Sequence, residues 1–161
     1  ITMKHSQDAV DLVKNSRVLL TTVSTLWTEN HKYIGYSHLI KVTDGLYAIE
    51  KLSKATAEAL LEKDLTLASK QLTNILTEDI PQNQFDALVS LIYDIGIKVF
   101  KSSSIPKLLL TGKTDELIAL FRKWNKYKKA PKYQLIDARQ KEIQLFNTGT
   151  FKRTRKRAAK G

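Results

Sequence analysis

The sequence contains no cysteine, only three prolines and six glycines among its 161 residues. Without cysteine, a disulfide scaffold, a thiolate metal site and a thiol nucleophile are all excluded. The three histidines, His5, His31 and His38, form no HExxH pattern, so we expect neither a zinc hydrolase nor any other metal or cofactor. His5 and His31 have no partner at metal-ligand spacing, and we interpret both as surface residues. Scarce glycine and proline favour long helices joined by short loops.

Long apolar runs are missing as well. No run approaches the roughly 18 residues that span a membrane, and no signal-peptide core is visible. We therefore expect no membrane partner. A first residue of Ile rather than Met is compatible with a processed or trimmed chain.

Positive charge is concentrated in two stretches. The chain has 27 Lys and Arg against 16 Asp and Glu, a net charge of +11. Residues 151–161 hold six basic side chains and no acid, and residues 117–136 hold six more and no acid. The rest of the chain is therefore nearly neutral, and attraction to an anionic partner is expected at these two patches.

Hydrophobic spacing predicts a first amphipathic helix over 7–18, followed by a small sheet of two or three strands. The strands are expected around 18–23 and 33–36, on either side of a Glu29-Asn30 turn signal. A cap residue, Ser53, then predicts the start of a long helix of about six turns.

Pro81 is expected to break this long helix, and Asn83 to cap the next one. The apolar stripe over 85–99 is the strongest in the chain and predicts the buried centre. Shorter helices are expected near 104–111, 115–126 and 134–146. The fold class predicted is α+β, predominantly α. We expect a small β lobe at about 18–50 and a helical part at 53–151, which comprises the long connecting helix and a helical lobe.

Six segments, in the right order, resemble those of phage-type lysozymes, the endolysin muramidases. They are SKATAEALL at 53–61, NQFDALVS at 83–90 with Ile95-Gly96, Phe100 with Ser102, Ser103 and Leu108, Arg122-Lys123-Trp124, Arg139 with Glu142 and Phe146, and FNTGTF at 146–151. The resemblance implies a two-lobed lysozyme-like domain over 1–151, with 152–161 as a mobile basic tail. It also implies peptidoglycan, whose glycan this family cuts.

Three catalytic positions of that family hold unsuitable residues. Arg17 stands where the family has a Glu as general acid, Leu26 or Trp27 where an Asp follows, and Tyr33 where a Thr helps to position water. Arginine stays protonated at physiological pH and therefore cannot act as a general acid. Loss of general acid catalysis costs about 10²–10⁴-fold in rate. We therefore interpret the chain as a catalytically inactive, lysozyme-like phage protein, used as a structural or accessory component of the virion.

Two alternatives stay open. The first is an active muramidase with a displaced catalytic pair that uses Glu29 or Asp11. The second is a nucleic-acid-binding protein that uses both basic patches. His38 matches the family's I-G-x-G-H segment, in which it is a structural hydrogen-bonding residue, and Ser37 replaces the second Gly.

The candidate binding residues are aromatic or basic. Trp27 is expected either to pack locally or to contact a partner, whereas Trp124 is expected in the core. The tail is interpreted as contacting a partner protein, nucleic acid or only solvent. The expected partners are other virion proteins, then peptidoglycan or nucleic acid, in a virion or the host cytoplasm. The candidates are Trp27, His38, Arg122, Lys126, Lys128, Lys129, Arg139, Lys152, Arg153, Arg155, Lys156 and Arg157.

Overall fold

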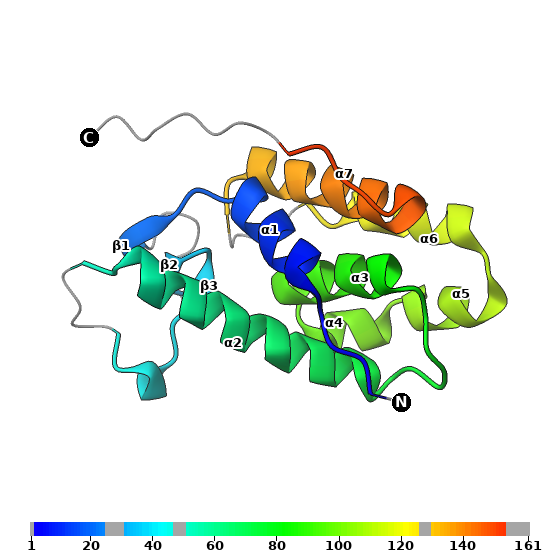
Figure 1. Cartoon of the computed structure of the whole chain (residues 1–161), viewed down its shortest axis with the longest axis horizontal. Helices are drawn as coiled ribbons and strands as arrows, with labels where there is room; N and C mark the ends of the chain where they lie inside the picture. Colours follow the sequence, from blue (N-terminus) through cyan, green and yellow to red (C-terminus); the bar gives the residue numbers. More distant parts are fainter. Residues whose placement is uncertain (1, 25–30, 47–50, 126–129, 154–161) are drawn as a thin grey trace.

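A small sheet occupies one end of the molecule and helices form the rest (Figure 1). The structure is a computed structural model that describes residues 2–24, 31–46, 51–125 and 130–153. The strands β1 (Leu20–Ser24), β2 (Tyr33–Gly35) and β3 (His38–Leu39) are antiparallel in the order β1-β2-β3. The helices are α1 (Gln7–Ser16), α2 (Lys54–Thr73), α3 (Gln82–Ile95), α4 (Ile97–Ser102), α5 (Ile105–Thr111), α6 (Thr114–Lys123) and α7 (Lys132–Thr148), with a 3₁₀ turn, η1 (Val42–Asp44). The predicted α+β, predominantly α fold is confirmed.

The first helix is held between two others. Ser6 caps α1, and the buried side chains of Ala9, Leu12 and Val13 face the core. In the structure, α1 packs on both α3 and α7. It ends at Ser16, because Arg17 takes an extended conformation and leads towards β1.

Ser53 caps α2 as predicted, since its hydroxyl accepts a hydrogen bond from the Thr56 amide at 3.1 Å. The prediction that this helix runs on to Pro81 is wrong, because α2 ends at Thr73. The amides of Ile75 and Leu76 both bond to the Leu72 carbonyl, at 2.9 and 3.1 Å. The Ile75 bond spans three residues rather than four, as in the tightened last turn of many helices, and the regular helix ends there.

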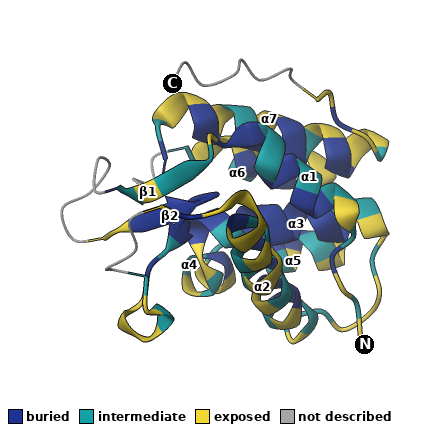
Figure 2. Cartoon of the chain, turned by 60° about the vertical axis from the view of Figure 1, so that its left-hand side comes forward, coloured by how far each residue is buried: buried dark blue, intermediate teal, exposed yellow. Residues whose placement is uncertain are grey.

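The central helix is α3, which lies among the other helices and is almost entirely buried (Figure 2). Leu88 is 0% exposed and Ile92 is 2% exposed, as expected of the buried centre. The apolar stripe that predicted one helix up to Val99 is divided, because Gly96 has φ of +82° and starts the separate helix α4. A backbone with this φ cannot continue a right-handed helix.

Asn83 does not cap α3, contrary to the prediction. The residue before the helix is Pro81, and Asn83 lies inside the first turn. Its side-chain amide donates to the carbonyls of Leu145 and Phe146 on α7, both at 3.0 Å. Asn83 therefore joins the start of α3 to the end of α7 rather than closing its own helix.

The turn between β2 and β3 has two residues in the left-handed region, Gly35 (φ +67°) and Ser37 (φ +65°). A Cβ atom on Gly35 would lie 3.5 Å from the side chains of Ala57 and Leu52, so the turn packs closely on the start of α2. Ser37 is the only non-glycine residue of the described chain with positive φ. It retains a glycine-like backbone without the freedom of glycine.

The residues before α1 are bound to α2 and α3. The ring of His5 is buried, with Nδ1 2.9 Å from Ser69 Oγ and Nε2 3.0 Å from Glu62 Oε1. Ser6 continues this attachment, because its amide donates to Asp86 at 2.8 Å. The prediction that His5 is a surface residue is therefore wrong, whereas His31 is exposed as predicted.

Candidate functional site

A cleft of about 480 Å³ lies where the sheet meets α2 and the end of α3. The sheet contributes Tyr33, His38 and Leu39, α2 contributes Asp64 and Leu67, and α3 contributes Tyr93 and Asp94. The cleft thus lies between the β end and the helical end of the molecule. Its position suits an extended ligand, and its wall combines aromatic, aliphatic and charged side chains.

His38 is fixed by two carboxylates. Its Nδ1 lies 2.5 Å from Asp64 on α2, and its Nε2 lies 2.9 Å from Asp44 in η1. Burial alone would lower the pKa of His38, but its hydrogen bonds to both carboxylates outweigh that effect and raise the pKa. The ring therefore joins the sheet to the long helix through two hydrogen bonds, as expected of a structural residue.

Arg17 is among the most completely buried side chains of the described chain, with a side chain 1% exposed. Its guanidinium forms an ion pair with Asp94 on α3 and donates to the Gln134 carbonyl on α7 at 3.4 Å. Asp94 is also 1% exposed. The residue predicted to stand at the family's general acid position is thus a cation that pairs with a buried carboxylate on α3 and bonds to α7.

Arg139 shares the same carboxylate from the other side. Its Nη2 lies 2.6 Å from Asp94, its Nε donates to Glu142 at 2.5 Å, and its Nη1 donates to the Trp124 carbonyl at 3.0 Å. Glu142 also accepts from Ser90 at 2.6 Å. Arg139 is buried and occupied, so this candidate binding residue does not reach a ligand, and the prediction for it is wrong.

The buried polar groups form one balanced cluster, in which two arginines (Arg17 and Arg139) meet two acids (Asp94 and Glu142). Burial raises the pKa of Glu142, although Arg139 opposes that effect. The pKa of the Arg139 guanidinium is raised, because Glu142 and Asp94 outweigh the opposing effect of burial. A charge of either sign removed from this cluster would leave its partner buried without compensation.

Tyr33, which is predicted to replace the family's water-positioning Thr, is buried in the wall of the cleft. Burial raises the pKa of the Tyr33 phenol. Tyr93 beside it donates its hydroxyl to the Tyr36 carbonyl, and burial raises its pKa well above the usual value. Both phenols are neutral at physiological pH, and neither is a proton donor of suitable strength for glycoside cleavage.

Glycoside hydrolysis needs one protonated and one ionised carboxyl group across the bond. Among the described residues that line the cleft, the carboxyl groups are Asp64, bonded to His38, and Asp94, bonded to two arginines. Cationic partners favour the ionised form. Each carboxyl group that the described part of the cleft supplies is thus already held by a basic side chain.

Asp11 does not line this cleft. It lies on α1, where it accepts from Gln7 at 2.9 Å and from Arg153 at 3.0 Å. Burial tends to raise the pKa of Asp11, but these two hydrogen bonds outweigh it and the pKa is lowered. An ionised Asp11 outside the cleft is unsuited to the role of a displaced general acid.

Several predicted residues lie outside the described residues: Leu26, Trp27 and Glu29, then Lys126, Lys128 and Lys129, then Arg155, Lys156 and Arg157. Of the others, Arg122 is exposed near the end of α6, and Trp124 is half-buried against the core as predicted. Lys152 and Arg153 lie against the helices: the Lys152 amide donates to Gln144 at 2.9 Å and Arg153 pairs with α1.

Sequence reasoning missed Asp64, Tyr93 and Asp94. One signal could have found Asp94, because an acid in the most apolar stripe of the chain needs a buried cationic partner. Asp64 and Tyr93 carry no such local signal. Among the described residues, no group of three His, Cys, Asp or Glu side chains is arranged to hold a metal ion. No described helix is long and apolar enough to cross a membrane.

Comparison with known sequences gives a consistent result. The sequence model of the family described as phage lysozyme matches residues 21–142. The chain is 34% identical over 151 residues to the endolysin of Bacillus phage PZA, covering 93% of this chain and 57% of that protein. It is 33% identical over 119 residues to an endolysin of Acyrthosiphon pisum secondary endosymbiont phage 1, covering 71% and 79%. The chain thus spans little more than half the length of the Bacillus phage relative.

Solved structures share the fold. The muramidase domain of SpmX from Asticaccaulis excentricus superposes with a TM-score of 0.73 at 29% identity, covering 90% of this chain and 98% of that one. The endolysin from Escherichia coli O157:H7 phage FAHEc1 superposes with a TM-score of 0.77 at 22% identity, covering 93% and 97%. At that lower identity, the second likeness concerns the fold alone.

Proposed function

Because the chain belongs to the phage lysozyme family, we propose that its cleft binds the glycan of bacterial peptidoglycan. The observation that carries this proposal is the family match over 21–142, which contains the strands and helices that line the cleft. Tyr33 and Leu39 offer faces on which a sugar ring could lie, and Asp64 and Lys41 offer polar contacts.

The relatives favour an active muramidase over the inactive protein that the sequence alone suggested. The matched phage proteins are named endolysins, and one solved neighbour is named a muramidase domain. Cleavage by this chain would need an acid other than the family's. Of the two candidates that the sequence offers, Asp11 lies outside the cleft and is ionised, so Glu29 remains.

One observation favours the second candidate, glycan binding without cleavage. Arg17, at the predicted position of the family's acid, is buried and paired with Asp94. In this place it cannot give a proton to a glycosidic oxygen. A chain of this kind would serve as a structural or accessory component that holds a virion or a larger assembly on the cell wall.

Co-sedimentation with purified peptidoglycan tests the binding. Leu67 lines the cleft and is 48% exposed, whereas Leu110 is 65% exposed on α5, outside the cleft lining. Leu67→Asp should weaken sedimentation and Leu110→Asp should not. If both variants sediment like the unaltered chain, the cleft does not bind peptidoglycan.

Release of dye from labelled cell walls separates the two candidates. Activity that Glu29→Gln abolishes, and that Glu78→Gln in the exposed α2–α3 connection leaves intact, would support the muramidase. Binding with no dye release would support the protein that does not cut.

A further inference from the structure

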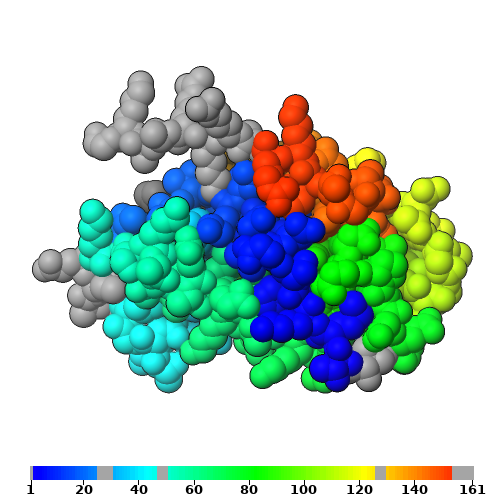
Figure 3. Space-filling view, in the orientation of Figure 1, coloured from blue at the N-terminus to red at the C-terminus, as the bar shows by residue number. Residues whose placement is uncertain are grey.

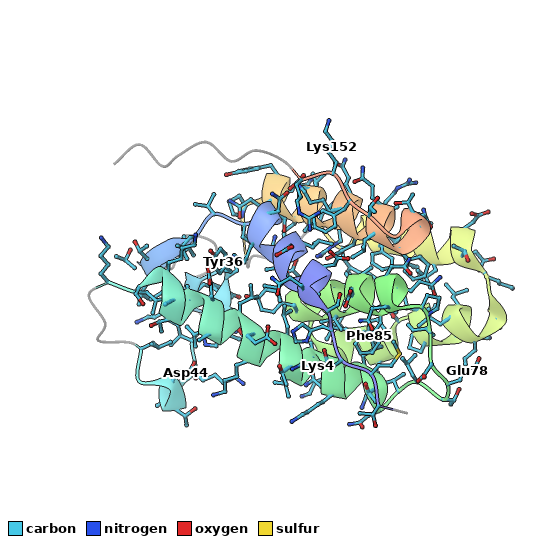
Figure 4. The ribbon with its side chains drawn as sticks, in the orientation of Figure 1. Lys4, Tyr36, Asp44, Glu78, Phe85 and Lys152 are labelled. Atoms are coloured by element: carbon cyan, nitrogen blue, oxygen red, sulfur yellow. The ribbon has the colours of Figure 1, made fainter. Side chains whose placement is uncertain are left out.

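A second hollow lies behind the cleft. It is a groove of about 1260 Å³ between the end of α1, the start of β1 and the first turns of α7. Figure 3 shows α1 in blue beside the last described residues of the chain in red, and Figure 4 labels Tyr36, which lines the groove at its sheet end. The groove and the cleft share no lining residue.

The groove gathers exposed apolar side chains. The described part of the chain has six large apolar residues that are strongly exposed, and three of them line this groove: Val18 at 52%, Tyr133 at 68% and Ile136 at 36%. Leu19 and Tyr36 add to the apolar floor. Clustering of exposed aliphatic and tyrosine side chains is typical of a protein-binding surface.

The charge of the groove is positive. Its lining contains four basic residues, Lys14, Arg17, Lys54 and Arg153, and two acids, Asp11 and Asp137. Arg17 is buried on Asp94, so the surface of the groove presents three cations against two acids. Some are already paired: Lys14 lies 3.0 Å from Glu58, Arg153 lies 3.0 Å from Asp11, and Asp137 pairs with Lys141. These pairs are part-exposed, and Lys54 begins α2 at the rim with its side chain exposed. An excess of cations around an apolar floor attracts an anionic occupant.

We propose that this groove binds an acidic peptide segment of a partner protein, with aliphatic or aromatic side chains on the apolar floor and carboxylates at the basic rim. A second copy of this chain has a net charge of +11, and the chain's own segment 154–161 has four basic residues and no acid. Both would bring positive charge to a positive groove. Nucleic acid has the right charge but would leave Val18, Tyr133 and Ile136 without apolar partners.

Fluorescence anisotropy of a labelled synthetic peptide, in which Glu alternates with Leu, tests the proposal. This peptide should bind, and added salt should weaken binding. A Lys-Leu peptide lacks the charge and a Glu-Ser peptide lacks the apolar side chains, so both should bind at least about tenfold more weakly. Equal binding of all three would overturn the proposal.

Matched variants locate the binding. Ile136→Asp should weaken binding of the Glu-Leu peptide by about tenfold or more, whereas Leu110→Asp, an equally polar change on α5, should alter it less than about twofold. Lys54→Glu should weaken it more than Lys107→Glu. All four positions are exposed, and thermal melting by circular dichroism checks that each variant folds. Equal effects of Ile136→Asp and Leu110→Asp would place the contact elsewhere and overturn the proposal.

The other occupants give different results. Labelled duplex DNA that binds more tightly than the peptide, and is weakened by Lys54→Glu but not by Ile136→Asp, would indicate a phosphate-binding surface. Dimers in sedimentation velocity that Ile136→Asp dissociates would indicate a second copy. If removal of 154–161 tightens peptide binding, and Ile136→Asp abolishes this gain, the segment 154–161 itself occupies the groove. Each of these results overturns the proposal.

Discussion

The side chains of Arg17 and Asp94 meet in the wall between the two hollows of the molecule: Arg17 lines the groove, Asp94 lines the cleft, and an ion pair joins them. The pair also joins α1 to α3, and Arg139 extends it to α7. The residue predicted to replace the family's general acid therefore forms an electrostatic connection between three helices.

Replacement of Arg17 should be costly. Arg17→Met leaves Asp94 with one cation instead of two, and loss of one member of a buried ion pair costs about 3–5 kcal/mol of unfolding free energy. Asp94→Asn added to Arg17→Met should recover part of this loss, because it removes the excess buried negative charge. Urea unfolding of the two single variants and the double variant measures the coupling. Additive effects of the two changes would contradict the pairing.

Arg17→Glu should fail to produce muramidase activity. It would place a third acid beside Asp94 and Glu142 with Arg139 as the remaining arginine of the cluster, so the variant should be less stable than the unaltered chain by about 3 kcal/mol or more. It also leaves Tyr33 in place and supplies no second carboxylate. Dye release from labelled cell walls, compared with that of the unaltered chain, tests this. A clear gain in activity would show that the scaffold still positions the acid correctly.

His38 should make stability depend on pH. The pKa of His38 is raised in the folded chain, so its contribution is fully present below the unfolded value of about 6.5 and is lost as pH rises through the folded value. The neighbouring carboxyl of Asp44 does not interfere, because its pKa is lowered and it titrates only in acid. The melting temperature should therefore fall as the pH rises above about 6.5, and this slope should flatten in His38→Gln. An unchanged slope would assign the effect to another group.

Ser37→Gly should stabilise the turn between β2 and β3. Ser37 has φ of +65°, and a side chain in the left-handed region costs about 1 kcal/mol or more. Glycine removes this cost but adds flexibility to the unfolded chain, so a net gain of about 0.5–1 kcal/mol is expected. Ser37→Ala is the control, because alanine keeps the Cβ atom and should give no gain. Stabilisation by alanine equal to that by glycine would refute the backbone explanation.

The core should respond strongly at α3. Leu88→Ala and Ile92→Ala should each cost about 2–5 kcal/mol, because both side chains are buried and each change leaves a cavity. Leu110→Ala on α5 is the control, with an expected cost below about 1 kcal/mol at an exposed site. A loss below about 1 kcal/mol at both core positions would contradict the central place of α3.

Removal of residues 154–161 should leave the melting temperature nearly unchanged, within the about 0.5 kcal/mol typical of surface changes. Further removal of Lys152 and Arg153 should cost slightly more, because Arg153 pairs with Asp11 and the Lys152 amide bonds to Gln144. Exposed pairs of this kind contribute about 0.2–1 kcal/mol. Unfolding on removal of 154–161 alone would show that the tail belongs to the fold.

Local signals predicted the elements better than their ends. Ser53 was predicted correctly as a cap because its hydroxyl needs only the Thr56 amide, three residues away. Asn83 has the same kind of side chain, but two carbonyls on α7 hold it, and sequence spacing contains no information on them. Gly96 divides an uninterrupted apolar stripe because of its φ, and the apolar pattern does not record φ.

The site residues that belong to a sequence motif could be predicted. The residues that are placed by an ion pair with a distant part of the chain could not. The motif placed Arg17, Tyr33 and His38, and the structure puts Tyr33 and His38 in the cleft and Arg17 behind it. The burial of His5 depends on Ser69 and Glu62, which lie far along the chain. From the sequence alone, His5 is expected on the surface, because no partner lies near it in the sequence. Long-range pairing therefore limited the sequence analysis more than local structure did.

The position of α1 between α3 and α7 affects how the chain is made. A ribosome releases α1 before α7, but the surface that covers α1 includes α7, which emerges more than a hundred residues later. Until then, the apolar faces of both α1 and α3 lack their cover and are open to association with other chains or with chaperones. Synthesis halted before α7 should therefore yield an insoluble or chaperone-bound product.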